Sequence, residues 1–179
     1  ATCDWSQLGD ALAKLGPMLA ENQIKLSLPS LRVDAFSVNM AAELETIRKG
    51  GLTFAPEAGT QRLRNVINKG VSDEDISTAL ESTFSHGWDR VKLYFMMGLP
   101  TETDDDIIGI AELAEKVVAL YREIRSRRDV KVTVSVSCFV PKPFTPFQWF
   151  GQNEKSEFER KQQLLKDNIR DRSIQFKYH

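Results

Sequence analysis

An acidic and a basic side chain stand 12 positions apart in this chain, and their types suit a ligand that carries both charges. Glu57 follows Phe54-Ala55-Pro56 and precedes Ala58-Gly59-Thr60, where a helix is expected to begin. Its carboxylate could accept hydrogen bonds from a diol or an ammonium group, and a solvated acid near a helix start explains it equally well. Lys69 precedes Gly70, and taken alone it is better explained as a cation at a helix C-terminus. Together the two side chains offer one acceptor and one cation to a zwitterionic ligand.

Two further short segments have an unusual composition. Gly98-Leu99-Pro100 follows an apolar run and predicts a turn poor in side chains, which a flat ring could approach with Leu99 as an apolar contact. A plain turn from strand to helix explains this segment almost as well. Arg32 and Asp34, close to Ser30, could line a polar cavity or form an exposed ion pair that contributes little. Both interpretations remain open.

A proline-rich loop over 140–149 carries Phe144, Phe147 and Trp149. Its prolines favour an extended, stiff connection. We expect this loop to cap the end of a sheet, and we favour that role over direct contact with a ligand.

The elements that must position these residues alternate between strand and helix. An amphipathic helix is expected over Ser6–Leu19, with a break near Gly16-Pro17. The remaining expected elements, in chain order, are a strand over Ile24–Val33, a helix over Val38–Lys49, a strand over Leu52–Ala55, helices over Gln61–Lys69 and Asp73–His86, a strand over Val91–Met97, a helix after Thr103, a strand over Lys131–Val140, a helix over Glu154–Asp171 and a strand over Ile174–Tyr178.

This alternation predicts an α/β fold with a parallel sheet built from right-handed βαβ units. The nearly continuous apolar run of Val91–Met97 predicts a strand that is buried on both faces. In parallel sheets, ligands bind beyond the carboxyl ends of the strands. The segments described above follow these ends, and so they are the candidates for a site.

Length, charge and cysteine content narrow the possible functions. The chain has 179 residues, so it is one domain over 1–179 and too short for an eight-unit barrel. Its net charge of −1 lacks the basic excess of a nucleic-acid surface. No apolar run is long enough to span a membrane. Its two cysteines, Cys3 and Cys138, form neither a disulfide framework nor a zinc motif, which favours a cytoplasmic location.

Taken in order, four segments resemble the radical S-adenosylmethionine (radical SAM) enzymes. The segments are Ser27–Asp34, Thr53–Thr60 with Asn68-Lys69-Gly70, Met97–Thr103 and Pro141–Pro146. The closest likeness is to Fe-S oxidoreductases that often carry a cobalamin-type domain, and to methylthiotransferase-like members. Each segment is a weak signal alone, but the ordered set is a strong one and covers most of the chain.

The resemblance implies a fold and a ligand. The strands would be the later βα units of a (β/α)6 core, a partial TIM-type barrel. Glu57 would bind the ribose hydroxyls of S-adenosylmethionine and Lys69 its methionine carboxylate, while Gly98 and Leu99 would lie against the adenine. Ser30 and Arg32 belong to the first of the four segments and are included among the cofactor-binding candidates. A 4Fe–4S cluster is implied for the full-length protein, and a cobalamin is possible.

The chain departs from the family pattern at the cluster. The family needs a Cys-x-x-x-Cys-x-x-Cys loop, and two cysteines 135 positions apart cannot form one. We therefore expect a piece of a longer enzyme, truncated at both ends and inactive alone, with 150–179 leading into a further domain. The exposed sheet edge near Ile24–Val33 would favour self-association.

Two alternatives stay open. The chain could be a self-contained, doubly wound domain that binds a nucleotide or a partner without redox chemistry. It could also be a degenerate radical SAM barrel that is kept as a scaffold. The sequence does not identify a substrate.

Overall fold

The computed structural model describes residues 5–24 and 51–178. The elements are α1 (Leu8–Glu21), β1 (Leu52–Glu57), α3 (Gln61–Val66), α4 (Asp73–Ser85), β2 (Arg90–Met97), α5 (Asp104–Arg125), β3 (Lys131–Cys138), α6 (Lys155–Asn168) and β4 (Ile174–Tyr178). The strand expected over Ile24–Val33, apart from Ile24 itself, and the helix expected over Val38–Lys49 lie outside the described residues. Ser30 and Arg32 lie outside them as well.

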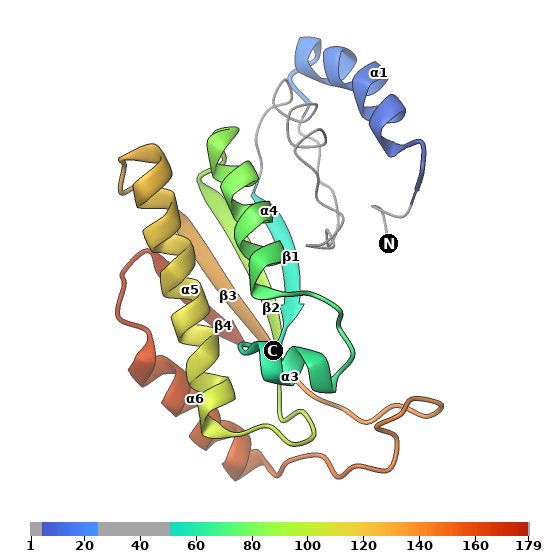
Figure 1. The fold of residues 1–179 in the computed structure, drawn as a ribbon, viewed down its shortest axis with the longest axis vertical. Helices are drawn as coiled ribbons and strands as arrows, with labels where there is room; N and C mark the ends of the chain where they lie inside the picture. The colour runs from blue at the N-terminus through green and yellow to red at the C-terminus, as the bar shows by residue number, and fades with distance from the viewer. Residues whose placement is uncertain (1–4, 25–50, 179) are drawn as a thin grey trace.

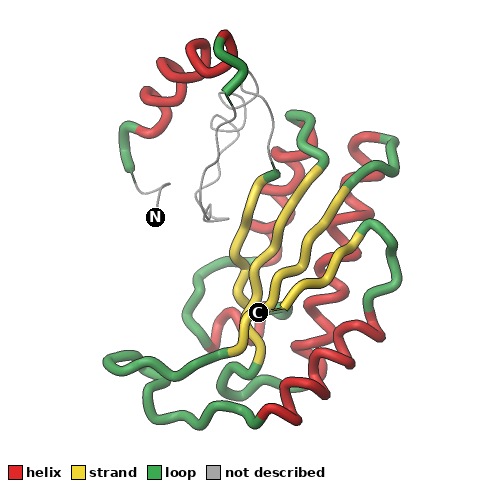
Figure 2. Tube along the Cα trace, turned by 180° about the vertical axis from the view of Figure 1, so that it is seen from behind, coloured by secondary structure: helices red, strands yellow, loops and turns green. Residues whose placement is uncertain are grey.

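The four described strands form one parallel sheet in the order β1-β2-β3-β4. α5 packs against β2, β3 and β4, with α4 and α6 beside it. Seen from behind, the strands lie in front of these helices, so the helices form one layer on one face of the sheet (Figure 1, Figure 2). The expectation of an α/β fold with a parallel sheet is confirmed.

Local capping explains where three helices begin. The Thr60 side chain accepts a hydrogen bond from the Leu63 amide at the start of α3. Reciprocal capping boxes open α4, at Ser72 with Asp75, and α5, at Thr103 with Asp106. These three starts agree with the sequence-based expectation.

β2 corrects one expectation, because it is buried on one face only. Val91, Leu93, Phe95 and Met97 are buried towards the helices, whereas the alternating Lys92, Tyr94 and Met96 are half-buried. α4, α5 and α6 lie on the same face, so no described helix layer covers the other one. The apolar run therefore belongs to a strand with one covered and one partly open face.

Two helix ends also differ from expectation. α1 is not broken at Gly16-Pro17 but continues through Pro17 to Glu21. Leu8, Leu12 and Gly16 form a buried stripe at helical spacing, and the helix continues although proline omits one backbone hydrogen bond. α3 ends at Val66, so Lys69 lies beyond the helix rather than in its last turn.

The core lies between the sheet and the layer of α4, α5 and α6. Leu93, Val132 and Val134 from the strands and Phe84 and Ala114 from the helices are completely buried in it. Among the described helices, none is both long and apolar enough to cross a membrane.

Candidate functional site

The structure brings Glu57 and Lys69 together at the carboxyl edge of the sheet. Glu57 ends β1, and the Lys69 Nζ atom donates a hydrogen bond to its Oε1 at 3.1 Å. The side chains are 27% and 26% exposed, so solvent and a ligand can reach both. The predicted pair of an acceptor and a cation therefore exists as an accessible ion pair.

The backbone of Glu57 is unusual. Its φ of 71° lies in the left-handed region, which costs a non-glycine residue on the order of 1 kcal/mol or more. The pairing of β1 with β2 also changes register between Phe54 and Glu57. Irregular strand ends of this kind redirect a side chain and are common beside active sites.

Left-handed residues gather at this edge. In the described part of the chain, six non-glycine residues have a positive φ. One of them, Glu57, is the last residue of β1, and three more lie in the turns that follow α3, β2 and β3: Asn68, Thr101 and Phe144. Such conformations persist only where the surrounding contacts enforce them. The carboxyl edge is therefore a place where packing imposes unusual turns.

Arg64 holds the two turns that carry Glu57 and Lys69. Its guanidinium is completely buried and donates to the carbonyl oxygens of Ala58 at 3.1 Å and Val71 at 3.0 Å. It also contacts the Asp73 carboxylate at the start of α4. The segments on either side of α3 are thus tied to one buried cation. Sequence reasoning missed Arg64, because no local pattern shows an arginine of a short helix turning inward.

The turn after β2 is held by a buried carboxylate. The backbone amide of Gly98 donates to Glu102 Oε1 at 2.8 Å, and that of Leu99 donates to Oε2 at 3.4 Å. Lys161 of α6 donates to Glu102 Oε1 at 2.8 Å and to Asn153 Oδ1 at 3.1 Å. The Lys161 and Glu102 side chains are only 6% and 1% exposed. This ion pair, also missed from the sequence, fixes the turn against α6.

The immediate surroundings of Gly98 and Leu99 are filled by protein. Gly98 has a φ of +84°, and a Cβ built on it would lie 2.6 Å from the Phe158 ring. Leu99 is 4% exposed and packs with Ala58, Leu63 and Phe139. The Leu99 side chain therefore packs among residues of the neighbouring turns. The roles of Gly98 and Leu99 in ligand contact stay predictions.

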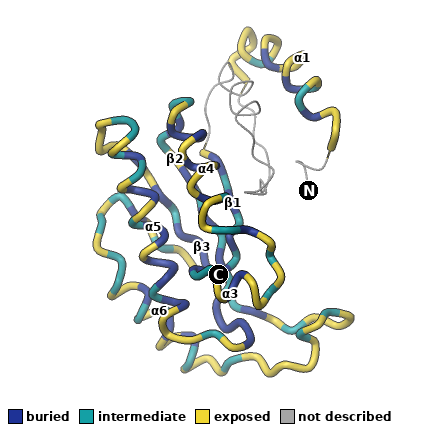
Figure 3. Tube along the Cα trace, viewed as in Figure 1, coloured by how far each residue is buried: buried dark blue, intermediate teal, exposed yellow. Residues whose placement is uncertain are grey.

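The proline-rich loop divides into a packed part and an exposed part. Phe147 meets the rings of Phe139 and Phe150 edge-on, at centroid distances of 6.3 and 5.5 Å. Phe144 and Trp149, in contrast, are 98% and 88% exposed. Figure 3 shows this loop as mostly exposed, whereas Gly98-Leu99-Pro100 at the start of the turn after β2 are buried. The loop therefore contacts the end of the sheet through Phe147.

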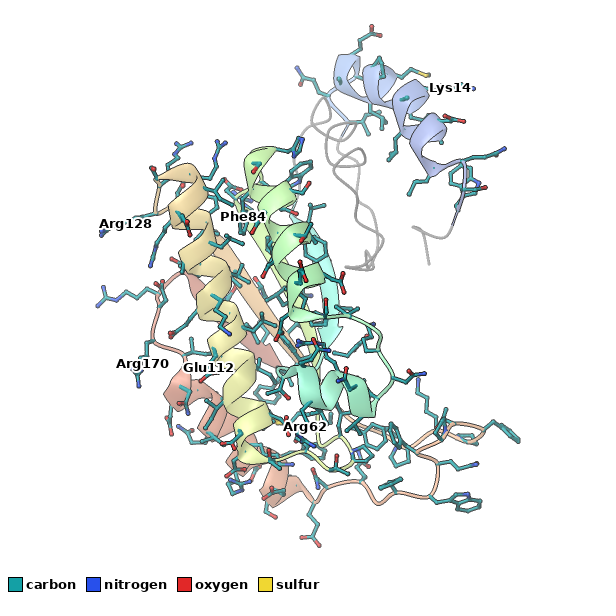
Figure 4. All side chains as sticks on the ribbon, in the orientation of Figure 1. Lys14, Arg62, Phe84, Glu112, Arg128 and Arg170 are labelled. Carbon is teal, nitrogen blue, oxygen red and sulfur yellow. The ribbon has the colours of Figure 1, made fainter. Side chains whose placement is uncertain are left out.

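Asp106 joins the turn after β1 to α5. It accepts hydrogen bonds from Thr60, Arg62 and Thr103, and Arg62 lies between α3 and the start of α5 in Figure 4. Burial acts to raise the pKa of Asp106, but these hydrogen bonds outweigh it and hold the pKa below its usual value. Asp106 is therefore an ionised group that links the start of α3 to the start of α5.

The described residues offer no metal centre. Cys138 is the one cysteine among residues 5–24 and 51–178, and burial raises the pKa of its thiol. No group of three or more histidine, cysteine, aspartate or glutamate side chains in these ranges could hold a metal ion.

Comparison with known proteins finds an uncharacterized archaeal relative but no family. No protein-family model matches the chain. It is 38% identical over 137 residues to an uncharacterized protein of the archaeon Methanocaldococcus jannaschii. The alignment covers 76% of this chain but only 28% of that protein. The chain thus spans less than a third of the relative that it matches.

Proposed function

We propose that this chain is the ligand-binding part of a longer radical SAM enzyme, and that it has no activity alone. The observation that carries the proposal is the accessible ion pair of Glu57 and Lys69, on a distorted strand end beside the Gly98–Leu99 turn. S-adenosylmethionine carries a ribose diol, a carboxylate and a flat base. These are the groups that an acceptor, a cation and a nearby turn can hold.

The sheet supports the barrel form of this proposal. Consecutive parallel strands with their described connecting helices on one face are the arrangement found along the wall of a βα barrel. A doubly wound sheet reverses its strand order and places helices on both faces. We therefore propose that the sheet is a segment of a partial TIM-type barrel whose interior is the polar face of Thr133, Ser135 and their neighbours. The buried Ser135 hydroxyl has no hydrogen-bond partner among the described residues.

Glu57 and Lys69 would bind the ligand by exchanging partners. The Glu57 carboxylate accepts from the ribose hydroxyls, and the Lys69 ammonium donates to the methionine carboxylate. Both contacts replace the present bond between the two side chains, and such a partly exposed pair contributes about 1 kcal/mol or less. Because the Leu99 side chain is buried, any contact of this turn with the adenine is made by its backbone.

The residues of this chain do not fit a 4Fe–4S cluster. The chain contains two cysteines, far apart in sequence, whereas such a cluster needs three thiolates in addition to the ligand. In the proposed enzyme another part of the parent protein would hold the cluster, which would supply the one electron that cleaves S-adenosylmethionine to methionine and a 5′-deoxyadenosyl radical. This chain binds and orients the ligand. The low cysteine content suits a reducing compartment, and we place the enzyme in the cytoplasm.

The lack of a cysteine motif also favours a second candidate. A domain that binds a nucleotide or a protein partner without redox chemistry needs no cluster. The same edge would then hold a diol or an ammonium group of another ligand. Stabilisation by a nucleotide such as ATP, with no response to S-adenosylmethionine, would favour this candidate.

The test measures S-adenosylmethionine affinity of the reconstituted parent protein by equilibrium dialysis. Glu57→Gln and Lys69→Met should each raise Kd by about ten- to a hundredfold, because each removes a charge-assisted hydrogen bond. Lys116→Met removes an exposed lysine on α5 and serves as the matched control, with Kd unchanged. Equal affinities in all four proteins would contradict the assignment.

A further inference from the structure

A hollow lies at the edge of the sheet opposite Glu57 and Lys69, where the strands begin. It has a volume of about 810 Å³, within the range of small-molecule sites. Part of its lining is the row Thr53, Lys92, Thr133 and Gln175, which are register partners across all four described strands. These residues alternate with the core-facing ones and belong to the face that the helices leave uncovered.

Cations predominate among the charged residues that line this hollow. They are Arg90, Lys92, Arg128, Lys131 and Arg172, against a single carboxylate, Asp129. Asp129 already accepts a hydrogen bond from Tyr121 at 2.7 Å and lies 3.6 Å from Arg127. The hollow is therefore positively charged.

Four of the cations have no anionic partner in the described part of the chain. Lys92, Arg128, Lys131 and Arg172 form no ion pair there; Lys92 donates a hydrogen bond to the Tyr94 hydroxyl, and Arg90 contacts Asp89 only at 3.7 Å. In Figure 4, Arg128 lies beside the end of α5, near the start of β3. Like charges gathered at one place repel each other, and a bound anion relieves that repulsion.

The cations come from three neighbouring segments. Arg90 begins β2, Arg128 and Lys131 lie at the start of β3, and Arg172 precedes β4. Arg90 and Lys131 are register partners, so their Cα atoms are separated by about one strand spacing, roughly 4.8 Å. Arg172 lies one strand further. This spread suits more than one anionic group, and guanidinium groups match phosphate oxygens in geometry.

We propose that this hollow binds a small molecule carrying two or more phosphate groups. The hollow lies at the opposite end of the uncovered face from Glu57 and Lys69, so in the barrel proposed above its ligand would occupy the end of the interior at which the strands begin. The chain's net charge of −1 and the limited volume of the hollow favour a compact phosphorylated ligand over a nucleic-acid strand.

The test is a calorimetric titration of this chain with inorganic tripolyphosphate at low ionic strength. We expect saturable binding of one molecule per chain, weakened by added salt. The double variant Lys131→Gln with Arg172→Gln should raise Kd by about a hundredfold, about tenfold for each lost charge-assisted contact. The control pair Lys116→Gln with Lys142→Gln removes the same charge from exposed positions outside the hollow. It should change Kd by less than about threefold.

Three results would overturn the proposal. The first is the absence of saturable binding. The second is an equal loss of affinity in the variant and control pairs, which would show a general charge effect. The third is that a ten-nucleotide single-stranded DNA displaces tripolyphosphate and binds more tightly, which would identify a nucleic-acid surface instead.

Discussion

The buried ion pair between Lys161 and Glu102 gives the sharpest prediction about how the candidate site is built. Lys161→Met keeps most of the side-chain volume and removes the charge. Glu102, 1% exposed, then loses its cation but keeps the backbone amides of Gly98 and Leu99. Removing one partner of a buried pair costs about 3–5 kcal/mol. Because the two amides remain, we expect the lower end, about 3 kcal/mol.

The assay is thermal and urea unfolding followed by circular dichroism. For a chain of this size, 1 kcal/mol changes the melting temperature by about 2–4 °C, so Lys161→Met should lower it by about 6–12 °C. Glu102→Gln and the double variant complete a cycle, whose coupling energy should be about 1–3 kcal/mol. Lys155→Met is the control on the same helix, because its ion pair with Glu159 is highly exposed, and it should cost less than about 0.5 kcal/mol. A Lys161→Met protein that melts within about 1 °C of the wild type, or an additive cycle, would refute this reasoning.

Three more expectations concern stability and association. Gly59→Ala should cost about 1–3 kcal/mol in urea unfolding, because a Cβ there would collide with the backbone of α5, whereas Gly151→Ala, which has open space, should leave stability unchanged. The folded-state pKa of Asp106 is lowered, so its contribution to stability is present above the unfolded value of about 3.9 and is lost as the pH falls below it. Asp106→Asn should therefore have a lower free energy of unfolding near pH 7, and that free energy should depend less on pH between about 5 and 2. Parallel pH profiles of the two proteins would count against this. Light scattering should show concentration-dependent self-association through the sheet edge expected near Ile24–Val33. A monomer over a wide concentration range would exclude this self-association.

Features that depend on neighbouring residues in sequence could be predicted. Thr60, Ser72 and Thr103 were identified as helix starts because a cap and its partner lie within three or four positions. The strand expected over Ile174–Tyr178 agrees with β4, because the short run of apolar and polar residues there is typical of a strand. That Glu57 and Lys69 could serve one ligand was inferred from their charges and their spacing of 12 positions, whereas Lys69 itself was expected in the last turn of a helix.

Features that depend on distant contacts could not be predicted. Lys161 and Glu102 are 59 positions apart, and nothing local marks either as buried. The partly open face of β2 follows from the placement of α4, α5 and α6 on one side of the sheet, which a single strand does not encode. Likewise, α1 continues through Pro17 with one face buried, whereas the local proline signal alone indicates a break.

The most direct test of the radical SAM assignment is an electron paramagnetic resonance spectrum of the reduced, anaerobically reconstituted parent protein, recorded with and without S-adenosylmethionine. The account predicts about four irons per chain at one site and a signal that shifts when the ligand is added. It also predicts that Glu57→Gln and Lys69→Met weaken this shift. A protein that binds no iron–sulfur cluster and does not respond to S-adenosylmethionine would contradict the account and leave the non-redox binding domain as the better assignment.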